Sequence, residues 1–201
     1  MTVGEVDPAV EKVLRSLEKQ QRRPDFQDYK ARFLNFAGDQ CIRASMHERG
    51  AVYYGLSINT FLGADRFDAA AAICRKLVRV IPHVVRARCT LTWLAMAKGL
   101  SAEAQQFVRE YAQAADSAGT EKLASRHVRS MVEMTQDPEL CWTLGDVLLW
   151  LGDDVGADRS FGIAHELRAR PRRLETEPER VIQIRRILLE GFTPGDGALA
   201  A

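Results

Sequence analysis

The 201-residue chain lacks the segments that would direct it into or across a membrane. No stretch approaches the roughly 18 consecutive apolar residues that a membrane-spanning helix requires. Glu5 and Asp7 stand near the start, where a secretory signal needs a basic flank followed by an apolar run. We therefore expect a soluble, cytoplasmic protein with no membrane partner.

The chain also lacks an excess of charge of either sign. Its 28 Lys and Arg against 27 Asp and Glu leave a net charge of +1, which gives no bulk electrostatic reason to expect a nucleic acid as partner. The densest basic cluster is Arg168, Arg170, Arg172 and Arg173. Glutamates surround this cluster and no aromatic residues interleave it for base stacking, so nucleic-acid binding through Arg168–Arg173 remains only the alternative function.

Motifs that carry chemistry are missing as well. The sequence contains no phosphate-binding loop, dinucleotide-binding glycine motif, zinc-protease motif or nucleophile elbow. The four histidines are isolated in sequence from a nucleophile, and an enzyme would need His127 or His165 to meet carboxylates in a pocket. The four cysteines form no Cys-x-x-Cys pair and have no nearby His at metal-ligand spacing, so we expect reduced thiols that pack as small buried residues. The sequence predicts no catalytic residues, no metal and no cofactor.

Helical periodicity is the feature that the chain does have, and it is clearest between Cys141 and Pro171. Two short apolar stripes flank a turn at Gly152-Asp153-Asp154, and each stripe has the spacing of one helix face. Their members are Leu144, Gly145 and Leu148 before the turn and Ala157, Phe161 and Ala164 after it. Because Gly145 and Ala157 lack bulk, Leu148 and Phe161 can close the gap between the two helices at about 8–10 Å between their axes.

This pattern resembles the tetratricopeptide repeat. The family's Leu-Gly-x-x-Tyr and Ala-x-x-x-Phe spacings are matched by Leu144-Gly145-x-x-Leu148 and by Ala157-x-x-x-Phe161. The resemblance implies an all-α fold, a right-handed helical solenoid of about ten helices. A weaker likeness connects the chain with the cytoplasmic chaperones of type III secretion translocators.

The register predicts three repeats, at about residues 51–84, 85–118 and 138–171. Ala70 and Ala104 are one repeat of 34 residues apart, whereas Ala104 and Ala157 are 53 apart, which is 34 plus 19. Nineteen residues are enough for one further helix, and we expect it, unpaired, at 119–134.

The two ends of the chain are predicted to cover the repeats. Residues 1–50 should form N-terminal helices, one ending near residue 22 and one near residue 46, that make a degenerate or capping repeat. Near the other end Thr176 and Glu179 form a capping box that opens a capping helix at 176–191, and residues 193–201 should be a disordered tail.

The resemblance also implies a binding site, because the first helices of tetratricopeptide repeats line a concave groove that holds peptides. The register places ten residues there, or at its edge: Asn59, Leu62, Arg86, Cys89, Trp93, Met96, Trp142, Asp146, Leu149 and Trp150. Only Asn59 and Arg86 match the residue types that clamp a partner's terminal carboxylate, which favours an apolar or amphipathic ligand. The implied function is a non-catalytic adaptor or chaperone that binds another protein or peptide. A homodimer and burial of the tryptophans against neighbouring helices remain alternatives.

Overall fold

The computed structural model describes residues 26–169, 183, 184, 186 and 187. The described residues form eight helices and no strand, so the all-α prediction is confirmed for this part of the chain. The chain divides into two compact units, residues 1–82 and 83–201, and each unit is described here by itself.

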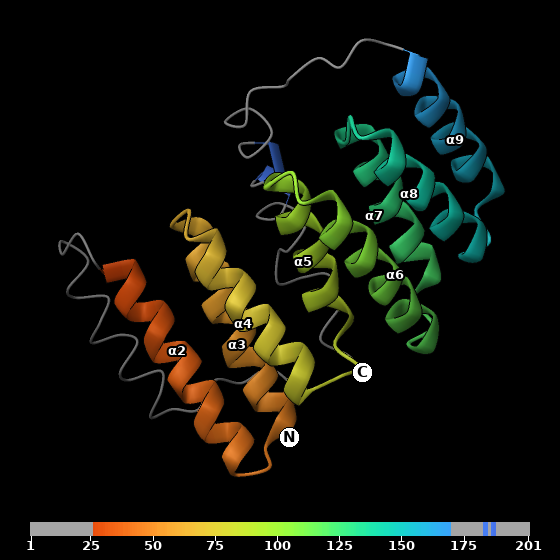
Figure 1. Cartoon of the computed structure of the whole chain (residues 1–201). Helices are drawn as coiled ribbons and strands as arrows, with labels where there is room; N and C mark the ends of the chain where they lie inside the picture. The colour runs from red at the N-terminus through yellow and green to blue at the C-terminus, as the bar shows by residue number, and fades with distance from the viewer. Residues whose placement is uncertain (1–25, 170–182, 185, 188–201) are drawn as a thin grey trace. The chain divides into compact units, whose positions relative to one another are not determined.

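The first unit contains α2 (Phe26–Arg43), α3 (His47–Gly63) and α4 (Phe67–Val80), in which α3 packs against both α2 and α4 (Figure 1). Apolar side chains of α2 and α3 form its buried core, among them Leu34, Ala37, Cys41 and Tyr53. The buried Ser57 hydroxyl on α3 donates a hydrogen bond of 2.8 Å to the Ala31 carbonyl on α2. These contacts hold α2 and α3 together along their length.

The second unit contains α5 (Val85–Ala97), α6 (Ser101–Ser117), α7 (Glu121–Met134), α8 (Pro138–Trp150) and α9 (Asp154–Ala169) (Figure 1). Helix α6 packs against α5, α7 and α8, while α9 packs along α8 and also contacts α7. The largest fully buried side chains of these five helices are Trp93, Val108, Tyr111, Met131, Leu144 and Leu148. Helix α8 is therefore in contact with three other helices, α6, α7 and α9.

Five of the seven links between successive helices use the same backbone turn. Each has one residue with a positive φ angle, a conformation that favours glycine, at Ser45, Asp65, Gly99, Gly119 or Gly152. In every case the next residue donates its N–H to the carbonyl five positions earlier, as Asp153 does to Leu148 at 2.8 Å. Of the two remaining links, the one between α4 and α5 contains Pro82, and the one between α7 and α8 consists of residues 135–137, directly before Pro138. The tight turn joins α8 to α9, whereas an extended link without a positive φ angle separates α8 from α7.

The observed helix limits in the first unit differ from those expected from the sequence. Helix α2 ends at Arg43 because Ser45 takes a positive φ of 59°, so α3 begins at His47 and not near residue 51. The polar start of α3 resembles a loop in sequence, but Glu48 lies in its first turn, where a carboxylate favours the helix N-terminus. Helix α2 packs along α3, so both helices belong to the first unit.

Several predicted segments lie outside the described residues. These are the helix expected to end near residue 22, the tail at 193–201 and most of the capping helix at 176–191. Within that last segment, residues 183, 184, 186 and 187 are described; they are helical and Ile184 is buried.

The close contact between α8 and α9 forms where the small and large residues of the sequence predict it. Gly145 lies under the Phe161 ring, and a Cβ atom at Gly145 would be only 2.5 Å from the Phe161 Cε1 atom. Ala157 is fully buried, and the Ser160 hydroxyl on α9 donates a hydrogen bond of 2.7 Å to the Cys141 carbonyl on α8. A side chain at position 145 would therefore force the Phe161 ring out of its place.

This contact predicts opposite effects of the same substitution at two helical glycines. Gly145→Leu should lower the free energy of unfolding by about 2 kcal/mol, because overpacking outweighs the better helix propensity of leucine. Gly162→Leu on α9 should leave it unchanged or raise it by up to about 1 kcal/mol, because a Cβ atom there meets no atom within 4 Å. Urea unfolding of the two variants measures both changes, and equal stability would contradict the packing of α8 on α9.

Candidate functional site

Helix α8 exposes a row of large apolar side chains. Trp142, Leu149 and Trp150 are 43%, 46% and 50% exposed, and the exposed Asp146 lies between them. Because positions three, four, seven and eight residues apart share one side of a helix, these four residues form a single stripe, which we call the α8 face. The other sides of α8 carry the buried residues Leu140, Cys141, Thr143, Leu144, Gly145, Val147 and Leu148.

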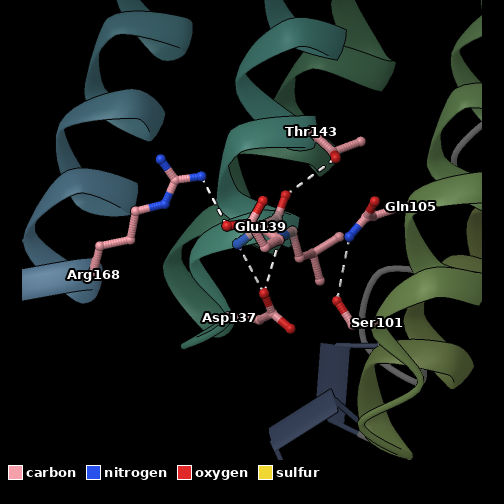
Figure 2. Close-up of polar contacts among 7 residues, drawn as sticks. Ser101, Gln105, Asp137, Glu139, Thr143 and Arg168 are labelled. Carbon is pink, nitrogen blue, oxygen red and sulfur yellow. Dashed lines mark hydrogen bonds and ion pairs between the residues drawn. The ribbon is translucent and has the colours of Figure 1, made fainter. Parts of the chain in front are cut away.

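The start of α8 is fixed by a cap that the sequence predicts. The Asp137 carboxylate accepts hydrogen bonds from the backbone N–H groups of Glu139 at 2.8 Å and Leu140 at 3.1 Å (Figure 2). Pro138 occupies the first helical position. The cap determines which residue begins the helix. It thereby sets the direction in which Trp142, one turn further on, leaves the helix.

Trp142 is held by contacts with α9. Its ring lies 4.8 Å from the Phe161 ring, measured between centroids, with the two planes inclined by 49°. The Arg168 guanidinium lies 5.2 Å from the centroid of the Trp142 ring, a distance at which a cation and an aromatic ring attract each other. Arg168 extends from α9 and donates a hydrogen bond of 2.8 Å to the Glu139 carboxylate on α8 (Figure 2). These contacts restrict the Trp142 side chain while leaving almost half of it exposed.

The turn between α8 and α9 is anchored to α7 by the buried Asp153 carboxylate. It accepts hydrogen bonds from the Arg129 guanidinium, from the Ser125 hydroxyl and, at 3.0 Å, from the Gly156 N–H in the first turn of α9. The hydrogen bonds from Arg129 in particular hold the pKa of Asp153 far below its usual value, and those from Ser125 and Gly156 act in the same direction. Asp153 is therefore ionised at neutral pH, and it fixes α9 relative to α7.

The remaining predicted site residues do not join the α8 face. Leu62, Cys89, Trp93 and Met96 are buried, and Trp93 is only 2% exposed. Asn59 and Arg86 are partly exposed, but Asn59 and Leu62 belong to the first unit. The structure thus brings together four of the ten predicted residues, namely Trp142, Asp146, Leu149 and Trp150, on one helix.

Sequence reasoning missed the residues that support Trp142. Glu139 and Arg168 are 29 positions apart, and nothing in their local sequence connects them. The sequence identifies Arg168 only as a member of a basic cluster, and Phe161 only as a residue that packs between two helices. The spacing of Trp142, Phe161 and Arg168 becomes informative once α8 and α9 are known to lie side by side.

A polar cluster inside the second unit contains a cysteine and a histidine. The His127 Nδ1 atom on α7 lies 2.8 Å from the Tyr111 hydroxyl on α6 and 3.6 Å from the Cys89 sulfur on α5. Burial raises the pKa of Cys89 to about 12, so the thiol is protonated at neutral pH. A protonated, buried thiol is a poor nucleophile, and the cluster is better explained as a contact that links three helices.

Comparison with known proteins places the chain in no family: no family model matches it, and no curated protein matches it. Among the described residues, no three His, Cys, Asp or Glu side chains lie close enough together to hold a metal ion. None of the described helices is both long and apolar enough to cross a membrane.

The burial of Trp93 predicts a large effect of its removal on stability. Trp93→Ala should lower the free energy of unfolding by about 3–5 kcal/mol, as expected when a buried aromatic ring leaves a cavity. Trp142→Ala should lower it by much less, because nearly half of that side chain is already in water. Thermal unfolding followed by circular dichroism compares the two variants, and similar losses in both would contradict the difference in burial.

The ionised Asp153 predicts a specific dependence of stability on pH. A carboxyl whose pKa is lowered by folding contributes stability above its unfolded pKa of about 4, and this contribution is lost as the pH falls toward the folded pKa. Asp153→Asn retains a side chain that can cap α9 but removes the charge, so it should cost about 1 kcal/mol or more at pH 7. The cost should shrink steadily below pH 4.

Unfolding in urea at pH 7, 4 and 2.5 measures this difference. Asp154→Asn is the matched control, because it removes a carboxylate from the exposed neighbouring position. A cost of Asp153→Asn that stays constant with pH would show that the ion pair with Arg129 does not stabilise the turn.

Proposed function

We propose that the protein is a non-catalytic interaction module and that it binds a segment of a partner protein across the α8 face. The observation that carries this proposal is the exposure of Trp142, Leu149 and Trp150 on one side of one helix. Large apolar side chains gathered on one exposed side of a helix often mark a surface that binds a partner. Tryptophan is also the residue most often found as an anchor of protein interfaces.

The support beneath the α8 face favours recognition by a preformed surface. Trp142 packs against Phe161 and Arg168, and the turn after Trp150 is anchored through Asp153 to α7. An anchor that is already held in place loses little conformational freedom on binding, so more of the contact energy appears as affinity. The α8 face therefore suits a partner that brings its own apolar side chains to a fixed site.

The proposal extends to the fold class, which we take to be a tetratricopeptide-like solenoid. Two observations support it. Ala70, Ala104 and Ala157, the small residues that set the register, are all fully buried, and α7 coincides with the segment at which the sequence predicts the extra helix. In that fold α8 is the first helix of a repeat, the kind of helix that lines the groove in this family. A cytoplasmic adaptor or chaperone is the corresponding role.

Other exposed features give weaker support to other sites. Tyr29 and Phe36 are exposed on α2, but the chain that immediately precedes α2 lies outside the described residues. In the basic cluster Arg168–Arg173, Arg168 forms an ion pair with Glu139 and lies against the Trp142 ring, so it helps to hold Trp142 on the α8 face. Binding that weakens steeply with salt would instead favour the nucleic-acid alternative.

Affinity purification from the native cell, with identification of the bound protein, tests the proposal. The partner recovered with the unaltered protein should be lost from Trp142→Ala and Trp150→Ala, with each substitution weakening binding by about thirtyfold, or 2 kcal/mol. Tyr29→Ala is the matched control, because it removes an exposed aromatic side chain far along the sequence from α8. Retention of every partner by the Trp142→Ala, Trp150→Ala double variant, with its helicity intact, would refute binding at the α8 face.

A further inference from the structure

The α8 face contains one carboxylate whose charge is not balanced. Asp146 lies one turn after Trp142 and one turn before Trp150, and it is exposed. Within the described part of the chain, its carboxylate makes no hydrogen bond or ion pair. Glu139, the other acidic residue on this side of α8, is paired with Arg168. A further cation that contacts α8, the Arg109 guanidinium on α6, donates a hydrogen bond of 3.5 Å to the Thr143 hydroxyl on α8 and makes no ion pair with Asp146.

The position of Asp146 makes this charge important for binding. A segment that covers Trp142, Leu149 and Trp150 must also displace water from Asp146, because all four residues lie on the same stripe. Removing water from a carboxylate costs several kcal/mol unless a cation or several hydrogen-bond donors replace it. For a purely apolar ligand, the cost of dehydrating Asp146 would offset much of the binding free energy gained by covering the two tryptophans.

We infer that the α8 face selects a basic amphipathic segment, whose apolar side chains meet Trp142, Leu149 and Trp150 and whose Lys or Arg pairs with Asp146. This inference rests on the proposed function and adds the chemistry of the partner. The distance along the helix axis from Trp142 to Trp150 is about 12 Å, since each residue advances by 1.5 Å. A segment of a little over two helical turns spans it.

Asp146 acts here as a determinant of specificity. A partner that carries Lys or Arg opposite Asp146 exchanges water for an ion pair, while one that carries Asp or Glu adds repulsion to the cost of dehydration. Arg168 does not supply the cation, because its guanidinium is engaged by Glu139 and by the Trp142 ring. Arg109 on α6 does not supply it either, because its guanidinium is hydrogen-bonded to the Thr143 hydroxyl and makes no ion pair with Asp146. The positive charge that pairs with Asp146 is therefore supplied by the ligand.

A selection from a peptide library tests this inference without a known partner. The probe is a phage-displayed library of 16-residue helical peptides, selected on the full chain and counter-selected on Trp142→Ala. Selected peptides should carry apolar residues at helical spacing with one enriched Lys or Arg. Replacing that Lys or Arg by Glu should weaken binding at least tenfold.

The Asp146→Lys variant provides the reciprocal selection. Because Asp146 is exposed and makes no hydrogen bond or ion pair, this variant should fold normally, which circular dichroism checks. Peptides selected on Asp146→Lys should carry Asp or Glu at the position where the original peptides carry Lys or Arg. Asp158→Lys, at an exposed position on α9, is the matched control and should select the same basic peptides as the unaltered chain.

The outcomes separate the inference from the proposed function. Peptides that depend on Trp142 but show no preference for a basic residue would overturn the inference and leave the α8 face as a binding site. Failure to recover any peptide that depends on Trp142 would overturn both. A dimer of the chain that Trp142→Ala dissociates would identify a second copy as the occupant, and would overturn the inference of a basic segment.

Discussion

The position of the Phe161 ring is the constraint on which the α8 face depends. The ring lies over Gly145, where no Cβ atom would fit, and it also contacts the Trp142 ring. One side chain of α9 thus sets the approach of the two helices and supports the exposed indole. Any change that displaces Phe161 alters the packing of α8 and the presentation of Trp142 together, so stability and binding are coupled at this point.

The rest of the second unit holds the pair formed by α8 and α9 in place. Helices α6 and α7 pack against α8, and Asp153 connects the turn after α8 to Arg129 and Ser125 on α7. Ser160 adds a buried hydrogen bond between α9 and α8. Because α6, α7 and α9 cover the other sides of α8, only one side of this helix is exposed to solvent or a ligand. That side carries Trp142, Asp146, Leu149 and Trp150.

Sequence reasoning predicts the parts of this arrangement that are encoded over short distances. Gly145 and Phe161 belong to adjacent helices joined by a tight turn, so their spacing alone indicates that they meet. The common stripe of Trp142, Asp146, Leu149 and Trp150 also follows from helical periodicity. Periodicity assigns a residue to one side of a helix, but it does not predict which other helix covers that side, as Trp93 illustrates. Trp93 occupies the predicted register and is nevertheless buried.

Longer-range contacts lie beyond such reasoning. The pairing of Glu139 with Arg168, and the approach of His127 to Tyr111, depend on how helices pack and not on local spacing. The start of α3 is not evident from the sequence, because the turn that precedes it uses Ser45 at a positive φ, where glycine is the usual signal. Glycines do mark the turns at Gly99 and Gly152, and the turn predicted at Gly152 coincides with the one observed.

Hydrogen exchange of the three tryptophan indole N–H groups, resolved by nuclear magnetic resonance, tests the central claim most directly. The protein contains only three tryptophans, so each signal can be assigned by a single Trp→Phe substitution. We expect the indole N–H groups of Trp142 and Trp150 to exchange rapidly, and that of Trp93 to be strongly protected. Strong protection of Trp142 and Trp150 in the monomeric protein would contradict an exposed α8 face and the function that we propose for it.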